Sequence, residues 1–236
     1  MQEKVDELRE KISLSIGYKA MTQLELLSLN FHVFEQNYRQ WKNYVESLKT
    51  PESFMQLWDY KSRRESNLVL AELTRLLLNF LGSATSLVAV TRNSVPIWYI
   101  NTDFAQEYEE RKDKVKSTDE TKFIEGLRNY AQHDRLPFLS NQYSIDMKEK
   151  KIDMQFVLDR DVLLRGDWKK DKGKDFLYKG KKEVYIESII DNYHDIILRF
   201  HQWIFGRIQE INLEEIRITS AMQDELGKLL NEILDL

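Results

Sequence analysis

Helix-breaking residues are scarce in this chain of 236 residues, which contains three prolines and eight glycines. Between them, apolar side chains recur at the spacing of one face of an α-helix. This pattern covers residues 3–48, with a bend predicted near the sequence SIGYK, and resumes after Pro51 until about Arg92. Ser53 follows Pro51 at a position where its hydroxyl can cap the second helix. The chain is therefore predicted to be mostly α-helical.

The remaining helices are predicted from the same spacing. The segment NSVPIWYINTD ends the second helix in this interpretation, and a third helix runs from about Asp103 to about Leu136 with a loosened, charged middle. Pro137 ends this helix because the residue before a proline disfavours the α conformation. Helical periodicity returns in VYIESIIDNYHDIILRFHQWIFGRIQEI, and a final amphipathic stretch closes the chain from about Leu213 to Leu236.

One segment follows a different pattern. In NQYSIDMKEKKIDMQFVLDRDVLL, apolar and polar residues alternate on both sides of a charged KEKK turn, as they do in a β-hairpin. The lysine-rich GDWKKDKGKDFLYKGKKE, residues 166–183, is predicted to be an exposed loop. We therefore predict an all-α fold, a single helical domain over residues 1–236, with a hairpin and loop insertion at about residues 139–182.

The composition limits the chemistry that the chain can perform. It has no cysteine, which removes disulfides, thiolate nucleophiles and cysteine-based metal sites. His194 and His201 are seven residues apart on a predicted helix, which is not a chelating spacing of four. Neither a metal nor another cofactor is therefore expected.

Charge and hydropathy limit where the chain acts. The formal net charge of −4 means that the protein as a whole does not attract nucleic acid. Any RNA site must therefore be a local, positively charged cleft. Apolar runs such as LLLNFLG, residues 76–82, are far shorter than the roughly 20 residues that span a bilayer. The N-terminal sequence contains acidic residues and lacks the apolar core of a signal peptide. We expect a cytoplasmic protein that does not bind a membrane.

One motif carries candidate chemistry. In FIEGLRNYAQHDRLPF, residues 123–138, the pattern R-N-x-x-x-H is formed by Arg128, Asn129 and His133. Chance produces this combination in about one chain in a hundred of this composition. On an ideal helix Asn129 and His133 share a face, whereas Arg128 lies about 140° from His133. Arg128 and His133 can converge only through the length of the arginine, a distorted turn or a second subunit.

The three side chains suit phosphate chemistry. At the C-terminal end of a helix, unpaired carbonyl groups favour a protonated imidazole, so His133 can exchange protons near neutral pH. The guanidinium of Arg128 can hold a phosphate through paired hydrogen bonds and stabilise developing charge, while Asn129 orients either group. A purely structural role is the alternative, because arginine and histidine near a helix end often satisfy terminal carbonyls or face solvent.

The residues LRNYAQHDRLP resemble the signature of HEPN domains, R-x(4-6)-H, in which a polar residue such as asparagine commonly follows the arginine. Family members are all-α bundles, and many are metal-independent endoribonucleases that dimerise to form one cleft from two copies of the motif. The resemblance implies that Arg128 binds the scissile phosphate. It implies that His133 transfers protons while the ribose 2′-hydroxyl attacks, which leaves a 2′,3′-cyclic phosphate.

The resemblance also implies a biological setting and partners. RNA would be the substrate, the protein would be a homodimer, and a bacterial toxin–antitoxin or antiviral defence system would be its context, with an antitoxin or activator as candidate partner. A competing interpretation is a non-catalytic helical module that binds a nucleotide or a protein. The long amphipathic helices and the weak overall charge favour that second interpretation.

Other polar and aromatic residues have simpler interpretations. A strip on the second helix is predicted to be a solvated face, with a polar cleft wall as the alternative: Arg75, Asn79, Ser83 and Ser86. Packing or surface roles are predicted for His32, His194 and His201. Core or interface positions are predicted for Trp41, Trp58, Trp98, Trp168 and Trp203. The lysine runs KKDKGKD and KGKK are expected to be solvated, with contact to an RNA backbone as the alternative.

Overall fold

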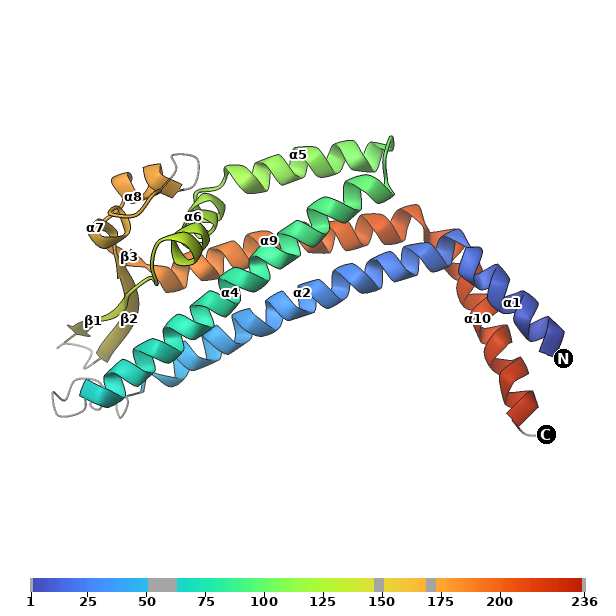
Figure 1. Ribbon diagram of the computed structural model, residues 1–236, viewed down its shortest axis with the longest axis horizontal. Coiled ribbons are helices and arrows are strands. Elements are labelled where there is room, and N and C mark those ends of the chain that lie inside the picture. Colours follow the sequence, from blue (N-terminus) through green and yellow to red (C-terminus); the bar gives the residue numbers. More distant parts are fainter. Residues whose placement is uncertain (1, 51–62, 147–150, 169–172, 235–236) are drawn as a thin grey trace. The chain divides into compact units, whose positions relative to one another are not determined.

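Two compact units make up the protein, one from residues 1–30 and 200–236 and the other from residues 31–199. In the computed structural model (Figure 1), the described residues are 2–50, 63–146, 151–168 and 173–234. Most of them are α-helical, and one antiparallel sheet has three strands, which confirms the predicted fold class with its hairpin. The single-domain assignment stays a prediction, and the proposed cap Ser53 lies outside the described residues.

The smaller unit contains both ends of the described chain. Helix α1 (Gln2–Leu14) packs against helix α10 (Leu213–Leu234), and its apolar stripe is buried: Val5, Leu8 and Ile12. The bend predicted near SIGYK is a break at Ser15, whose Oγ accepts a hydrogen bond of 3.1 Å from the backbone N–H of Tyr18. The same Oγ lies 2.9 Å from the hydroxyl of Thr219 on α10, so Ser15 both starts the next helix and holds α10.

Gly17 lies just inside helix α2 (Ile16–Ser47), where it faces α10. A Cβ added to Gly17 would overlap the backbone carbonyl oxygen of Glu215 and the hydroxyl of Thr219. Only a residue without a side chain therefore allows α2 and α10 to approach this closely.

The core of the larger unit lies between three long helices, which run alongside one another in Figure 1: α2, α4 (Arg63–Trp98) and α9 (Ile186–Ile211). The ring of Phe34 on α2 lies 5.5 Å from the ring of Phe80 on α4 and 6.4 Å from that of Tyr193 on α9, measured between centroids. Aromatic rings at these separations attract one another beyond the area they bury. The apolar spacing predicted from the sequence thus forms one continuous core here.

Two helices occupy the stretch where one was predicted from Asp103 to Leu136. They are α5 (Asp103–Ser117) and α6 (Asp119–His133), and Thr118 separates them. Its backbone N–H bonds the carbonyl of Val115 at the end of α5, while its hydroxyl accepts a hydrogen bond of 3.3 Å from the N–H of Thr121. The prediction of a single helix was wrong because the capping threonine was read as part of a loosened charged segment.

The predicted end of the second helix was also wrong, since α4 continues through Pro96 to Trp98. Proline lacks the N–H that would bond the carbonyl of Arg92, yet Pro96 is in the last turn, where few later hydrogen bonds are lost. Burial of Val95 and Tyr99 on either side holds the turn in place. The reversal comes later, at Asn101, which has a positive φ of 60°.

The sheet follows α6 directly. Strand β1 (Leu139–Asp146) pairs antiparallel with β2 (Lys151–Asp159), with Leu139 opposite Leu158. This is the predicted hairpin. A third strand, β3 (Glu183–Tyr185), pairs with the end of β2 and had no signal in the sequence.

The lysine-rich segment was predicted to be an exposed loop, and this was wrong in part. A short helix precedes it, α7 (Arg160–Leu163), and another forms within it, α8 (Asp175–Lys179). Trp168 and Leu177 are only 4% and 0% exposed, because both join the core of the larger unit. The lysines in the described part of the segment remain at least partly exposed.

Helix α4 is long and apolar enough to cross a bilayer, by length and composition alone, over Arg64–Trp98. Of its most apolar window, 44% is buried inside the protein, and core helices commonly meet the same criterion. The expected lack of a membrane partner and the cytoplasmic location therefore stay predictions.

Candidate functional site

Helix α6 carries all three residues of the R-N-x-x-x-H motif. Acidic residues in its first turn, Asp119 and Glu120, complement the positive end of the helix dipole. Its apolar side is buried and fixes the rotation of the helix: Phe123, Ile124, Leu127 and Tyr130. The motif residues therefore occupy defined positions beside the core.

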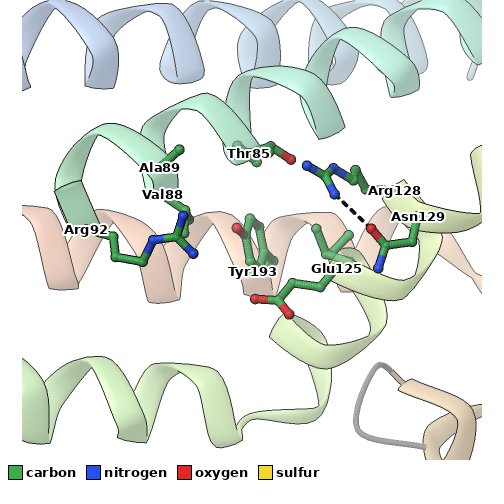
Figure 2. Close-up of a pocket in the computed structure, with 10 residues that line it drawn as sticks. Thr85, Val88, Ala89, Arg92, Glu125, Arg128, Asn129 and Tyr193 are labelled. Carbon is green, nitrogen blue, oxygen red and sulfur yellow. Dashed lines mark hydrogen bonds between the residues drawn. The ribbon is translucent and has the colours of Figure 1, made fainter. Parts of the chain in front are cut away.

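Arg128 is half-buried on α6. Its Nη1 donates a hydrogen bond of 2.8 Å to Oδ1 of Asn129 (Figure 2). Its Nε is shielded from solvent and has no hydrogen-bond partner within the described ranges. The positive charge of this half-buried guanidinium favours an anionic ligand at its accessible atoms.

Arg128 lines a pocket of about 270 Å³ between α4, α6 and α9, which we call the arginine pocket. Figure 2 shows the guanidinium group of Arg92, on α4, across the pocket from that of Arg128, with the ring of Tyr193 between them. The carboxylate of Glu125 also faces this space, and Asn129 closes one side. Two cationic groups and one anionic group thus surround the pocket.

Tyr193 forms part of the floor of the arginine pocket. Its side chain is buried, and this burial raises the pKa of the phenol, with a further contribution from the negative charge of Glu125. The phenol therefore stays protonated and offers a neutral hydroxyl near the two arginines.

His133 is the last residue of α6 and is exposed. It lines a second pocket of about 380 Å³, which we call the histidine pocket; its walls include Asn129, Tyr130, Asp134, Asp167 and Trp168. Arg128 is not among the residues that line this second pocket.

The two pockets meet at Asn129, which lines both. The structure therefore brings Asn129 to Arg128 and to His133, but places Arg128 and His133 on different pockets. This agrees with the angular separation expected on a regular helix. Because α6 is α-helical through His133, a distorted turn does not bring Arg128 and His133 together.

Several residues of the two pockets were missed in the sequence. Arg92, Glu125 and Tyr193 line the arginine pocket, and Asp167 and Trp168 line the histidine pocket. Four of these five come from elements other than α6, so no local spacing pointed to them. Only Glu125 could have been found from local spacing, because it lies three residues before Arg128 and is therefore its neighbour on the helix surface.

The other candidates lie outside both pockets. Arg75, Asn79 and Ser86 are exposed, which confirms a solvated face for these three, whereas Ser83 is buried and its hydroxyl donates to the carbonyl of Phe80. His32 is exposed and His194 and His201 are buried, in agreement with surface and packing roles. Trp41 is buried in the core, and Trp58 lies outside the described residues.

His194 is a buried histidine with one ring nitrogen, Nε2, paired to a carboxylate. Its Nε2 lies 2.5 Å from a carboxylate oxygen of Glu35, and its ring stacks on Tyr38 with centroids 3.7 Å apart. These contacts join α2 and α9 and give His194 a packing role in the core. Within the described ranges, no group of three or more histidine and acidic residues is arranged to hold a metal ion.

Comparison of the chain with protein-family models, with curated proteins and with solved structures found no match. The likeness to HEPN domains therefore rests on the motif itself and on its position at the end of a helix.

Proposed function

We propose that the protein is a metal-independent endoribonuclease of the HEPN type. The observation that carries the proposal is that Asn129 lines both the arginine pocket and the histidine pocket. An RNA phosphate bound by Arg128 would therefore lie next to the space that His133 faces. Arg92 adds a second cation on the far side of the phosphate site.

The reaction uses the nucleophile of the substrate. His133 accepts the proton of the ribose 2′-hydroxyl as this oxygen attacks the adjacent phosphorus, and the bond from phosphorus to the 5′-oxygen breaks. The leaving 5′-oxygen takes a proton from water, which gives a 5′-hydroxyl end and a 2′,3′-cyclic phosphate end, and His133 later returns its proton to the solvent. Arg128 stabilises the negative charge that grows on the phosphoryl oxygens, and Asn129 holds the guanidinium in place.

A homodimer fits the separation of Arg128 from His133. In a pair of chains, the exposed His133 of one copy can reach the phosphate held by Arg128 of the other, so the separation of about 140° between the two residues on one helix is no obstacle. In this proposal the enzyme acts in a bacterial toxin or defence system, where an antitoxin or activator would control access to the two pockets.

RNA cleavage in excess EDTA tests the proposal. Wild-type protein should produce cyclic-phosphate ends, whereas His133→Ala and Arg128→Ala should each lose most of the activity, by about a hundredfold or more. His32→Ala is the matched control, because His32 is exposed on α2 and lines neither pocket. Equal cleavage by wild-type protein and His133→Ala would rule the assignment out.

A nucleotide-binding module without catalysis is the second candidate. It is favoured by the fact that Arg128 bonds Asn129 and lines a different pocket from His133. This candidate predicts that a nucleoside phosphate binds, that Arg128→Ala weakens binding, and that His133→Ala leaves it unchanged. Calorimetry with a mononucleotide, beside the cleavage assay, separates the two functions.

A further inference from the structure

Tyr193 is a buried residue that carries a polar group to the wall of the arginine pocket. Its side chain is only 3% exposed, and Figure 2 shows it between the guanidinium groups of Arg92 and Arg128. Its hydroxyl forms no hydrogen bond within the described ranges, yet it is not one of the unpaired polar atoms there that are sealed from solvent. The hydroxyl is therefore open to a molecule in the pocket.

The core of the larger unit holds the ring of Tyr193 in place. Its centroid lies 6.4 Å from that of Phe34 and 6.1 Å from that of Phe80, and both contacts are edge-to-face. On the same face of α9, Ile190 and Ile197 are buried on either side of it. The hydroxyl is thus fixed in position before any ligand arrives.

A partner for this hydroxyl has to come from outside the chain. Thr85 lines the same pocket, but its hydroxyl already donates a bond of 2.9 Å to the carbonyl of Leu81. Tyr193 has no such bond, and buried polar groups nearly always have a partner in proteins. Water can meet this need in the free protein, and a ligand that displaces the water must bring an acceptor in its place.

The charges around the pocket determine which acceptor fits. The guanidinium groups of Arg92 and Arg128 favour an anion. Burial, and then the negative charge of Glu125, raises the pKa of Tyr193, so the phenol stays a neutral donor. A phosphate suits this set, because it carries negative charge and several oxygens that can each accept a hydrogen bond.

We propose that Tyr193 is a phosphate-binding residue, whose hydroxyl donates a hydrogen bond to an oxygen of the phosphate that Arg92 and Arg128 hold in the arginine pocket. The two arginines supply charge from α4 and α6, and Tyr193 supplies a fixed neutral donor from α9. That the phosphate belongs to RNA rests on the proposed ribonuclease function, but binding can be measured without cleavage.

Binding of single-stranded RNA with 2′-fluoro groups tests this role on the full chain, because such RNA lacks the attacking hydroxyl and cannot be cleaved. Tyr193→Phe keeps the ring and removes the donor. Its affinity, measured by fluorescence anisotropy, should be about tenfold or more below that of wild-type protein, since a hydrogen bond to a charged group is lost. The slope of log K against log salt should not change, because a neutral donor releases no counterion.

The stability of the free protein separates a binding role from a structural one. Without RNA, Tyr193→Phe should unfold at the urea concentration of wild-type protein or at a higher one, because the lost hydroxyl has no partner in the described chain. A lower unfolding midpoint would show that the hydroxyl supports the fold and would overturn the proposal. Tyr44→Phe is the matched control and should bind RNA like wild-type protein, because Tyr44 is half-buried on α2 and lines neither pocket.

The binding data can contradict the role of Tyr193 in three ways. Unchanged affinity in Tyr193→Phe, or no binding by wild-type protein, would overturn it. A shallower salt slope in Tyr193→Phe would mean that the change acts through the arginines and would overturn it too. Binding that depends on Tyr193 without cleavage of natural RNA would refute the ribonuclease alone, whereas cleavage with unchanged affinity in Tyr193→Phe would refute the role of Tyr193 alone.

Discussion

Nη1 of Arg128 donates a hydrogen bond of 2.8 Å to Oδ1 of Asn129, although neighbouring side chains on a helix point about 100° apart. The bond links the residue that faces the arginine pocket to the residue shared with the histidine pocket. The guanidinium is thereby oriented before a phosphate binds.

Replacing Asn129 should therefore reduce catalysis more than folding. Asn129→Ala removes the acceptor of a charged hydrogen bond worth about 1.5–3 kcal/mol, so kcat/KM for RNA cleavage should fall about ten- to a hundredfold. Asn79→Ala, an exposed change on α4, should leave kcat/KM unchanged. A variant at Asn129 with full activity would show that Arg128 needs no such support.

A site shared between two chains makes a specific prediction for mixed variants. If His133 acts on the phosphate held by the partner, a dimer of one Arg128→Ala chain and one His133→Ala chain retains one intact site. After the two inactive variants are mixed and exchange chains, about a quarter of wild-type activity should return. Half of the dimers are then mixed, and each mixed dimer has one intact site of two. Light scattering should show a dimer at the same concentration.

The outcome without rescue is equally informative. A mixed dimer that stays inactive, while light scattering confirms chain exchange, would mean that Arg128 and His133 act within one chain. A monomer at micromolar concentration would contradict the shared site.

Arg92 should contribute to RNA binding by charge. Arg92→Ala removes one cation from the arginine pocket, so the slope of log K against log salt for single-stranded RNA should become shallower by about 0.7. Arg92→Lys should keep most of the slope. Arg75→Ala, on the same helix but paired with Glu72 and outside the pocket, serves as the control and should leave the slope unchanged.

Even a single methyl group at Gly17 should reduce the stability of the protein. Gly17→Ala places a methyl group against the carbonyl of Glu215 and should lower the free energy of unfolding by about 1–3 kcal/mol in urea titrations. Gly227→Ala, on α10 with open space around it, should instead raise the free energy of unfolding by up to about 1 kcal/mol. Similar effects of both changes would contradict the close approach of α2 to α10.

His201 should make the stability depend on pH. Its burial lowers the pKa of the imidazole to about 4, against about 6.5 in an unfolded chain. Between about pH 4 and 6.5 the folded state binds fewer protons at this imidazole than the unfolded state does. The free energy of unfolding is therefore at its full value above about pH 6.5 and falls by about 3 kcal/mol at most as the pH drops toward 4. Urea titrations of wild-type protein and His201→Gln across this range measure the difference.

The control for His201 is the exposed His32. His32→Gln should change the free energy of unfolding equally at all these pH values. If wild-type protein and His201→Gln lose stability in parallel as the pH falls, other groups are responsible for the acid sensitivity.

The sequence predicted those features that depend on neighbouring residues. The break at Ser15, the hairpin and the motif helix ending before Pro137 all follow from local spacing and capping. Strand β3 is only three residues long and forms because the end of β2 offers it hydrogen bonds, which no local pattern encodes. Pro96 stayed helical because buried neighbours outweighed its local preference.

The candidate site, like the fold, was predictable only where it depends on residues close together in the sequence. Arg128, Asn129 and His133 lie on one helix, so their relative directions followed from helix geometry. Arg92, on α4, and Asp167, beyond the hairpin, reach the pockets only through tertiary packing. The placement of the motif residues on one helix could thus be predicted from the sequence, whereas the residues that surround them could not.

Thr118 is the C-cap of α5 and the N-cap of α6, so this one residue determines where α6 begins. Each residue of a helix turns the chain by about 100°, so one residue inserted between the buried Leu127 and Arg128 would turn the motif away from α4 and α9. Such a chain would keep R-N-x-x-x-H unaltered. A sequence that matches the motif can therefore have an arginine that faces away from such a pocket, and the number of residues from the capping threonine to the arginine would reveal the difference.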